Sequence, residues 1–341
     1  MTNEKKNHKP ETIVLERLQL NTPTGIRLGQ PRAVGALSLV PMFHEGPTAI
    51  YAPYAAVQEG GLVEVREVTG GGQVNTLVAT NRMDQPVLLL EGEILEGMQQ
   101  TRVLNITILL PAKSEVKIPV SCVEAGRWSS TSAVARRHDF HMSPRVRLRN
   151  NQTVVVSARQ MGAYMSNQGD VWASVNEELA AHNVESSTRE HAEIGRQKRA
   201  DVEQTLAKLE PEPGQCGVLA VLGGKPMCLD LFDRASTLEA VWSGLVGSYA
   251  LDAMTVPKPA AAARDLERSL AWLAGLPKAI ATAHPGVGLG TNVVLSSPKA
   301  GATGLVLDDA LVHLGAFAME GGDARFDRPS RRARQFEDRV Y

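Results

Sequence analysis

The chain has 341 residues, of which 43% are hydrophobic, 21% are charged and 4% are aromatic, and its formal net charge at pH 7 is −1. This composition is typical of a globular protein, and the length fits about two domains of roughly 150 residues or one large α+β unit. The nearly neutral charge and the scarcity of aromatic residues argue against a dedicated nucleic-acid binder, so we expect no nucleic-acid partner.

Cysteine usage and hydropathy indicate the cellular compartment. The three cysteines, Cys122, Cys216 and Cys228, cannot all pair with one another and show no Cys-x-x-Cys spacing, which favours a reducing cytoplasm. The N-terminus has no apolar core of a signal peptide, and no run approaches the ~18 apolar residues of a membrane span. We therefore expect a cytoplasmic protein without membrane association.

The first half of the chain has the pattern of a β-rich unit. Residues 1–11 are polar and charged, so they are expected to form a disordered tail. Residues 12–160 contain many short apolar or alternating runs divided by turn residues, which predict an antiparallel β-sandwich or barrel-like sheet. The expected strands include residues 13–20, 35–43, 62–68, 74–80 and 87–90.

The stretch 85–128 is predicted to contain a β-hairpin. Residues 102–110 and 116–124 both alternate between apolar and polar side chains, and the five residues between them suit a turn. If both apolar faces point into one core, Leu110 lies opposite Val116 and Arg102 lies opposite Glu124. Two buried charges at the open end of the hairpin must pair, either as a structural ion pair or as part of a ligand site. Pro119 suggests that the second strand lies at a sheet edge.

Polar side chains converge at this open end and form the predicted site. Glu93 and Glu124 are the candidate carboxylates for general acid/base catalysis. The remaining candidates bind substrate: the guanidinium groups would hold negative charge and the amides would orient polar edges. They are Gln99, Arg102, Asn105, Arg127 and Trp128. Cys122 is a weaker candidate for a nucleophile, because it is expected on the core face and the motif offers no histidine partner.

A basic segment follows the hairpin. Between Arg127 and Arg159 there are seven arginines and one acidic residue, Asp139. Alternation at residues 145–149 predicts a strand with three guanidinium groups on one face, which would be either an anion-binding surface or a solvated basic loop. His138 and His141 flank Asp139, but no third ligand is apparent nearby, so no metal or other cofactor is predicted.

The second half of the chain is predicted to be a mixed helical and hairpin region. A helix begins at Asn167 or Asp170, and a capping-box pattern at Ser187 begins another that ends near Leu209. Further helices are expected at 236–254 and 261–273. Hairpins are expected at 216–232 and 303–317, with His313 a satisfied core residue. Residues 161–320 would pack against residues 12–160, as a separate region or as one unit, and 321–341 would be a mobile tail. The expected fold class is α+β.

Two runs in the central stretch resemble a known family. GEILEGMQQTRVLN (92–105) and IPVSCVEAGRW (118–128) are similar to the motifs of the ARG and rhodanese-phosphatase-superfamily-associated protein domain. The resemblance covers about residues 35–319, and it departs at Thr101, where the family more often has Asn. It implies association with ADP-ribosylglycohydrolase and phosphatase-type proteins, and it assigns no chemistry.

Two functions follow as hypotheses. The first is a cytoplasmic enzyme acting on an anionic, nucleotide-like or ADP-ribose-like substrate; the alternative is a non-catalytic ligand-binding or partner-binding module. Carboxylates within reach of one another in an open pocket would favour catalysis. Ion pairs that are enclosed in the core would favour a structural or binding role for these residues. A cupin-like metal site is disfavoured, because the central strands contain no histidine.

Overall fold

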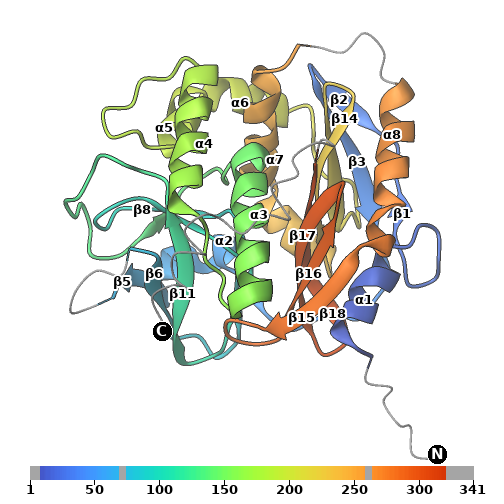
Figure 1. Ribbon diagram of the computed structural model, residues 1–341, viewed down its shortest axis with the longest axis horizontal. Coiled ribbons are helices and arrows are strands. Elements are labelled where there is room, and N and C mark those ends of the chain that lie inside the picture. The colour runs from blue at the N-terminus through green and yellow to red at the C-terminus, as the bar shows by residue number, and fades with distance from the viewer. Residues whose placement is uncertain (1–7, 69–73, 258–262, 320–341) are drawn as a thin grey trace, which may run out of the picture.

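The structure is a computed structural model, and it describes residues 8–68, 74–257 and 263–319. Over these residues the strands form sheets of nine, six and three strands with helices between and outside them, so the predicted α+β class is confirmed (Figure 1). The tails predicted at 1–11 and 321–341 fall largely or wholly outside the described residues.

The nine-stranded sheet joins the start of the chain to its end. Its order is β1-β3-β13-β14-β18-β17-β16-β15, with β2 paired to β3. The pairing of β3 with β13 is antiparallel and runs from Leu37↔Leu222 to Met42↔Gly217. The strands are β1 (Arg27–Leu28), β2 (Arg32–Val34), β3 (Leu37–Phe43), β13 (Gly217–Leu222), β14 (Lys225–Phe232), β15 (Ile280–Pro285), β16 (Thr291–Ser297), β17 (Ala300–Leu307) and β18 (Ala310–Ala318).

Side-chain alternation divides this sheet between two cores. Leu229 and Leu231 of β14 pack with α1 (Pro10–Arg17) and α8 (Ala263–Leu273), whereas Cys228 and Phe232 pack with α7 (Ala235–Met254). Figure 1 shows α1 and α8 on the outer face and α7 on the inner face. Asp230 has the same parity as Cys228, so this acidic residue points into the inner core.

The six-stranded sheet carries the central motif. Its order is β12-β8-β9-β11-β6-β5, and the three-stranded sheet has the order β10-β7-β4. Helix α3 (Pro144–Met161) contributes buried side chains both to the core of these sheets and to the core around α7. The strands are β4 (Ala52–Pro53), β5 (Val63–Glu67), β6 (Thr76–Asn81), β7 (Val87–Leu89), β8 (Ile94–Glu96), β9 (Arg102–Leu104), β10 (Ile108–Leu110), β11 (Ser114–Cys122) and β12 (Arg136–Arg137). The remaining helices are α2 (Tyr54–Val57), α4 (Gln168–Ala181), α5 (Ala192–Gln197) and α6 (Arg199–Leu206), with 3₁₀ turns η1 (Gln58–Gly60) and η2 (Leu276–Lys278).

The predicted register of the central hairpin is wrong. Cys122 lies opposite Arg102, and Val120 opposite Leu104, which is a shift of two residues. The first part of β11 pairs with β6 instead, and residues 108–110 leave the hairpin as β10 to pair with β7. Pro119 lies where the partner of β11 changes from β6 to β9, so this strand is not at the sheet edge.

Three other predicted elements differ from the structure. Residues 13–20 were expected in a strand, but α1 occupies 10–17, where Ile13 and Val14 pack against the large sheet. Residues 145–149 belong to α3 rather than to a strand. The helix expected from Ser187 to Leu209 is divided into α5 and α6 at Lys198.

The elements with strong local signals are confirmed. Helix α4 begins after Asn167, whose side chain accepts a hydrogen bond from the Gly169 N–H. The hairpins β13–β14 and β17–β18 and the helices α7 and α8 lie where they were expected. No helix within the described ranges is long and apolar enough to cross a bilayer.

Candidate ligand-binding site

The turn after β8 brings a serine-rich loop against the central motif. Gly97 has a φ of +89° and Met98 a φ of +51°. The Met98 N–H donates to Ser132 O, and the Thr131 N–H donates to Met98 O, both at 3.1 Å. A Cβ on Gly97 would lie 3.0 Å from Ser132 Oγ. Both the backbone conformation and the close approach therefore favour glycine here.

A pocket of about 450 Å³ opens beside this turn. Three parts of the chain form it: the end of β8 with its turn, residues 127–136 between the motif and β12, and residues 190–196 at and before α5. The lining residues are Glu96, Gly97, Arg127, Thr131, Ser132, Arg136, Glu190 and Arg196. Three arginines and two glutamates leave the lining with one net positive charge.

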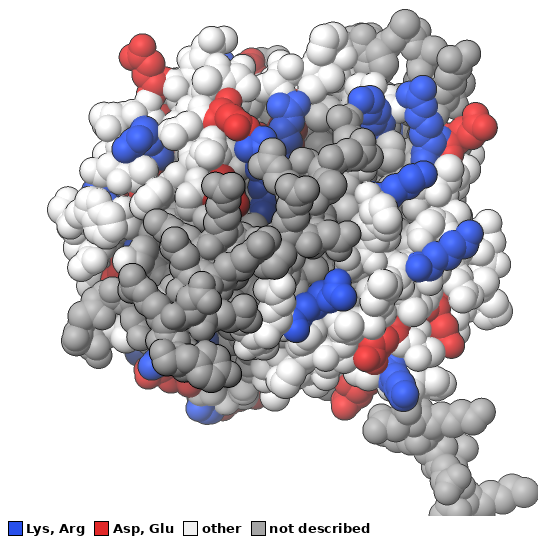
Figure 2. All heavy atoms as spheres, in the orientation of Figure 1, with Lys and Arg blue, Asp and Glu red and all other residues white. Residues whose placement is uncertain are grey.

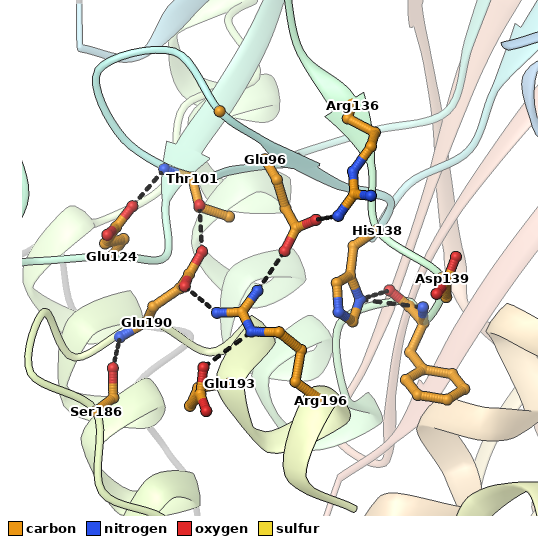
Figure 3. Close-up of polar contacts among 12 residues, drawn as sticks. Glu96, Thr101, Glu124, Arg136, His138, Asp139, Ser186, Glu190, Glu193 and Arg196 are labelled. Carbon is orange, nitrogen blue, oxygen red and sulfur yellow. Dashed lines mark hydrogen bonds and ion pairs between the residues drawn. The ribbon is translucent and has the colours of Figure 1, made fainter. Parts of the chain in front are cut away.

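Ion pairs and hydrogen bonds link the charged side chains of the pocket wall to one another (Figure 3). Arg136 lies opposite Glu96 across the β12–β8 pair and donates to its carboxylate at 2.9 Å. Arg196 donates to the other oxygen of Glu96 at 2.5 Å and also pairs with Glu190 and Glu193. Thr101 extends the network, because its hydroxyl donates to Glu190 at 2.6 Å and its N–H donates to the Glu124 carboxylate at 2.9 Å.

The arginines of the pocket differ in the donors that they leave available. All five N–H donors of a guanidinium are engaged at Arg127, by the Glu124 carboxylate and the carbonyls of Gly97, Met98 and Ser129. The Arg136 side chain is 81% exposed, and Glu96 is its one acceptor among the described residues. Arg136 is therefore the guanidinium best placed to bind an incoming anion.

Glu124 is enclosed by its partners. Burial alone would raise its pKa, but hydrogen bonds from Arg127 and the Thr101 N–H outweigh burial and lower the pKa. The predicted pair with Arg102 is not formed. Arg102 instead lies 3.7 Å from Glu67 and donates to Val74 O at 3.1 Å.

Glu93, the second predicted carboxylate, lies away from the pocket lining. It is 1% exposed and accepts from Arg137 Nε at 2.7 Å and from the Leu90 N–H at 3.0 Å. Burial raises the pKa of Glu93, and Arg137 opposes the shift without cancelling it. Glu93 and Glu124 thus each have an arginine of their own, and neither lines the 450 Å³ pocket.

The remaining predicted site residues are also dispersed. Asn105 is buried, donating to Tyr164 O at 3.0 Å and accepting from Ser121 Oγ at 2.6 Å. Gln99 is exposed, while its neighbour Gln100 points inward and donates to Glu124 O at 3.0 Å. Trp128 is 61% exposed and follows Arg127 directly. The structure therefore brings together Glu124 and Arg127 near the pocket, with Trp128 next to them in sequence.

Several pocket residues are absent from the predicted site. Arg136 was part of the basic segment, and Glu190 and Arg196 belonged to the helix expected from Ser187 to near Leu209. They meet Glu96 because the backbone at Glu190 bridges to Glu124 and the His191 N–H donates to Val123 O at 3.0 Å. This contact spans more than 60 residues and leaves no local pattern in the sequence.

Cys122, the weaker candidate for a nucleophile, is buried. Burial raises the pKa of the Cys122 thiol to about 11, which leaves it protonated near neutral pH. Within the part of the chain that the structure describes, no three His, Cys, Asp or Glu side chains are grouped as metal ligands.

A family model described as the ARG and Rhodanese-Phosphatase-superfamily-associated Protein domain matches residues 25–317. Searches of curated proteins and of solved structures gave no match. The matched region contains all the residues that line the pocket.

Proposed function

Since the chain belongs to the ARG and rhodanese-phosphatase-superfamily-associated protein domain family, we propose that its 450 Å³ pocket binds an anionic small molecule. Phosphate-bearing nucleotides and ADP-ribose-like compounds are the first class to test, because the family name refers to ADP-ribosylglycohydrolases and phosphatases. The observation that carries the proposal is the exposed Arg136 guanidinium, held by Glu96 beside Arg196 and the hydroxyl-bearing loop. Guanidinium groups bind phosphate and carboxylate oxygens in bidentate fashion.

The geometry supports binding better than catalysis by the two predicted carboxylates. Glu93 is buried against Arg137, and Glu124 is held by both oxygens against Arg127. A general acid or base must lie within hydrogen-bonding reach of a bound substrate. The proposed role of Glu124 is therefore to hold Arg127 in the pocket wall, and that of Glu93 is structural, as the partner of Arg137.

Trp128 is proposed to contact the ligand. Its indole is 61% exposed and adjoins Arg127 in sequence. An exposed indole offers a flat surface on which a nucleobase can stack, and such stacking contributes roughly 1–3 kcal/mol per base. A ligand with both a phosphate and an adenine ring would use this surface together with Arg136.

Isothermal titration calorimetry tests this proposal with ADP-ribose, inorganic phosphate and adenosine as separate probes. We expect ADP-ribose to bind, and Arg136→Gln to weaken its affinity by at least about tenfold, because a hydrogen bond to a charged group contributes about 1.5–3 kcal/mol. If inorganic phosphate binds and ADP-ribose and adenosine do not, the pocket is a site for a small oxyanion and has no subsite for a nucleobase.

The matched control is Arg32→Gln. Arg32 is an ion-paired, one-third exposed arginine on β2, where it lies 3.9 Å from Glu212. The Arg32→Gln substitution should leave the affinity for ADP-ribose unchanged. If none of the probes binds, or if Arg136→Gln binds as tightly as Arg32→Gln, the pocket does not have the proposed function.

A further inference from the structure

Two carboxyl groups meet inside the protein, away from the proposed pocket. Glu178 of α4 and Asp252 of α7 interact electrostatically, and both lie against the start of α3, where Asp252 accepts from the Arg145 N–H and Glu178 lines a small pocket with Arg145. Glu178 is 5% exposed and Asp252 is 0% exposed. Two ionised carboxylates in contact and out of water repel strongly, so such a pair is stable when one of them carries a proton.

The hydrogen bonds around the pair leave a place for that proton. Asp252 Oδ2 accepts from the Arg145 N–H at 3.2 Å, in the first turn of α3. Asp252 Oδ1 and Glu178 Oε2, by contrast, have no hydrogen-bond partner. The nearest basic group to Glu178 Oε2 is His191 Nε2 at 3.6 Å, which is longer than a hydrogen bond. A proton between the two carboxyl groups provides the missing donor.

We propose that Glu178 and Asp252 share one proton at neutral pH and so form a buried proton-binding site that joins α4 to α7. The other polar and charged groups that act on the pair are Ser143, Arg145, His182 and His191, and Lys198 acts on His182.

Access and electrostatics both agree with this site. A pocket of about 60 Å³ is lined by Glu178 together with Arg145 and Arg149, so Glu178 provides the route by which the pair exchanges protons with solvent. Burial and the contact with Glu178 raise the pKa of Asp252 well above its usual range. Burial would also raise the pKa of Glu178, but His191 and Ser143 outweigh it and lower the pKa.

The sign of the pH effect follows from the raised pKa. The folded protein keeps the shared proton, whereas the unfolded chain releases it above the ordinary pKa of aspartate, 3.8. The stabilisation is therefore complete at low pH and is lost as the pH rises through the pKa of the folded pair. Between pH 3.8 and the pKa of the folded pair, the equilibrium constant for unfolding should rise about tenfold per pH unit, because unfolding releases one proton.

Denaturant unfolding of the full chain from about pH 5.5 to about pH 9 tests the proposal. Wild type should show this rise, and in both Asp252→Asn and Glu178→Gln the slope should be smaller by about one proton, since an amide in either position donates the hydrogen bond without a titrating proton. The raised pKa of Glu93 gives a slope of the same sign, but it is present in wild type and in both variants. The lowered pKa of His182, which results mainly from burial, gives an opposite slope below its usual 6.5. Because Glu178 also acts on the pKa of His182, the slopes of the variants are compared above pH 6.5.

Glu177→Gln is the matched control, because Glu177 is the preceding residue on α4, is 62% exposed and pairs with Arg149. It should keep the wild-type slope. An undiminished slope in Glu178→Gln would mean that Asp252 titrates alone, and an undiminished slope in Asp252→Asn would place the proton elsewhere. Either result would overturn the proposal, and one folded variant of the two is enough to decide.

Discussion

Arg147 has a side chain with no exposed surface, between two carboxylates from distant parts of the chain. It donates to Glu91 at 2.7 and 3.1 Å and to Asp230 at the same two distances. Burial alone would raise the pKa of Asp230, but Arg147 and His313 outweigh it and hold the pKa well below its usual range. His313 in turn contacts Thr107 at 2.7 Å, so the predicted core histidine is confirmed as buried and hydrogen-bonded.

Replacing Arg147 with methionine should therefore destabilise the protein severely. The change leaves two buried carboxyl groups without their cation, and we expect a loss of about 3–5 kcal/mol in the free energy of unfolding. Denaturant unfolding near neutral pH measures it. Arg149→Gln, two positions along the same helix, removes a 45% exposed guanidinium and should cost less than about 1 kcal/mol. Equal losses in the two variants would show that the buried network contributes no special stability.

The sequence identified these arginines but not their environments. Arg145, Arg147 and Arg149 alternate over five residues, and the same five letters fit a strand or one turn and a half of helix. The helical stripe becomes clear only over a longer window, in which Val146, Asn150 and Val154 recur at intervals of four and are buried in α3. Asp230, the partner of Arg147, lies 83 residues away, and local patterns carry no information about it.

At the scale of elements, the turn after β8 is the part of the pocket most sensitive to substitution. Gly97→Ala forces alanine to a φ of +89° and places Cβ 3.0 Å from Ser132 Oγ. We expect a loss of about 1–3 kcal/mol in the free energy of unfolding together with weaker ligand binding, because the loop that supplies Thr131 must move. Unfolding and calorimetry on the same preparation measure both effects.

Gly35→Ala separates strain from crowding. Gly35 also has a positive φ, +63°, but nothing lies within 4 Å of the position of its Cβ. The substitution should cost backbone strain alone and leave ligand binding unchanged. If Gly35→Ala weakens binding as much as Gly97→Ala does, the loop contact is not the reason for the effect.

The strands of the central motif show what apolar patterns determine. The alternation in β9 and β11 predicted correctly that Leu104 and Val120 are buried. It fixed which face each strand presents, but a shift of two residues preserves the face, so the pattern could not choose between adjacent registers. In the structure β6 pairs with the first part of β11, and β7 pairs with β10. The sequence of the hairpin does not show that these other strands compete for pairing.

For the whole molecule, the nine-stranded sheet makes the two halves of the chain interdependent. Strands β1 to β3 come from the first 43 residues, and the rest of the sheet comes from residues 217–318. The core around α7 likewise draws buried side chains from both halves, including Leu39, Leu90 and Leu245.

A fragment comprising residues 12–160 should therefore not fold as an independent unit. It would keep the six-stranded sheet but would leave β3 without β13 and Leu90 without the α7 core. We expect no cooperative thermal transition from it, in contrast to the full chain, as followed by circular dichroism. A sharp transition in the fragment would show instead that the β-rich region is a domain of its own.

The distance along the chain between β3 and β13 also sets a delay during synthesis. About 170 residues must be added after β3 before its partner exists, and at roughly 5–20 residues per second a ribosome needs about 10–35 s to add them. During that interval β3 can pair only with the short strands β1 and β2, and its other edge has no partner on the nascent chain. Production of this protein should thus depend on temperature and on chaperone supply.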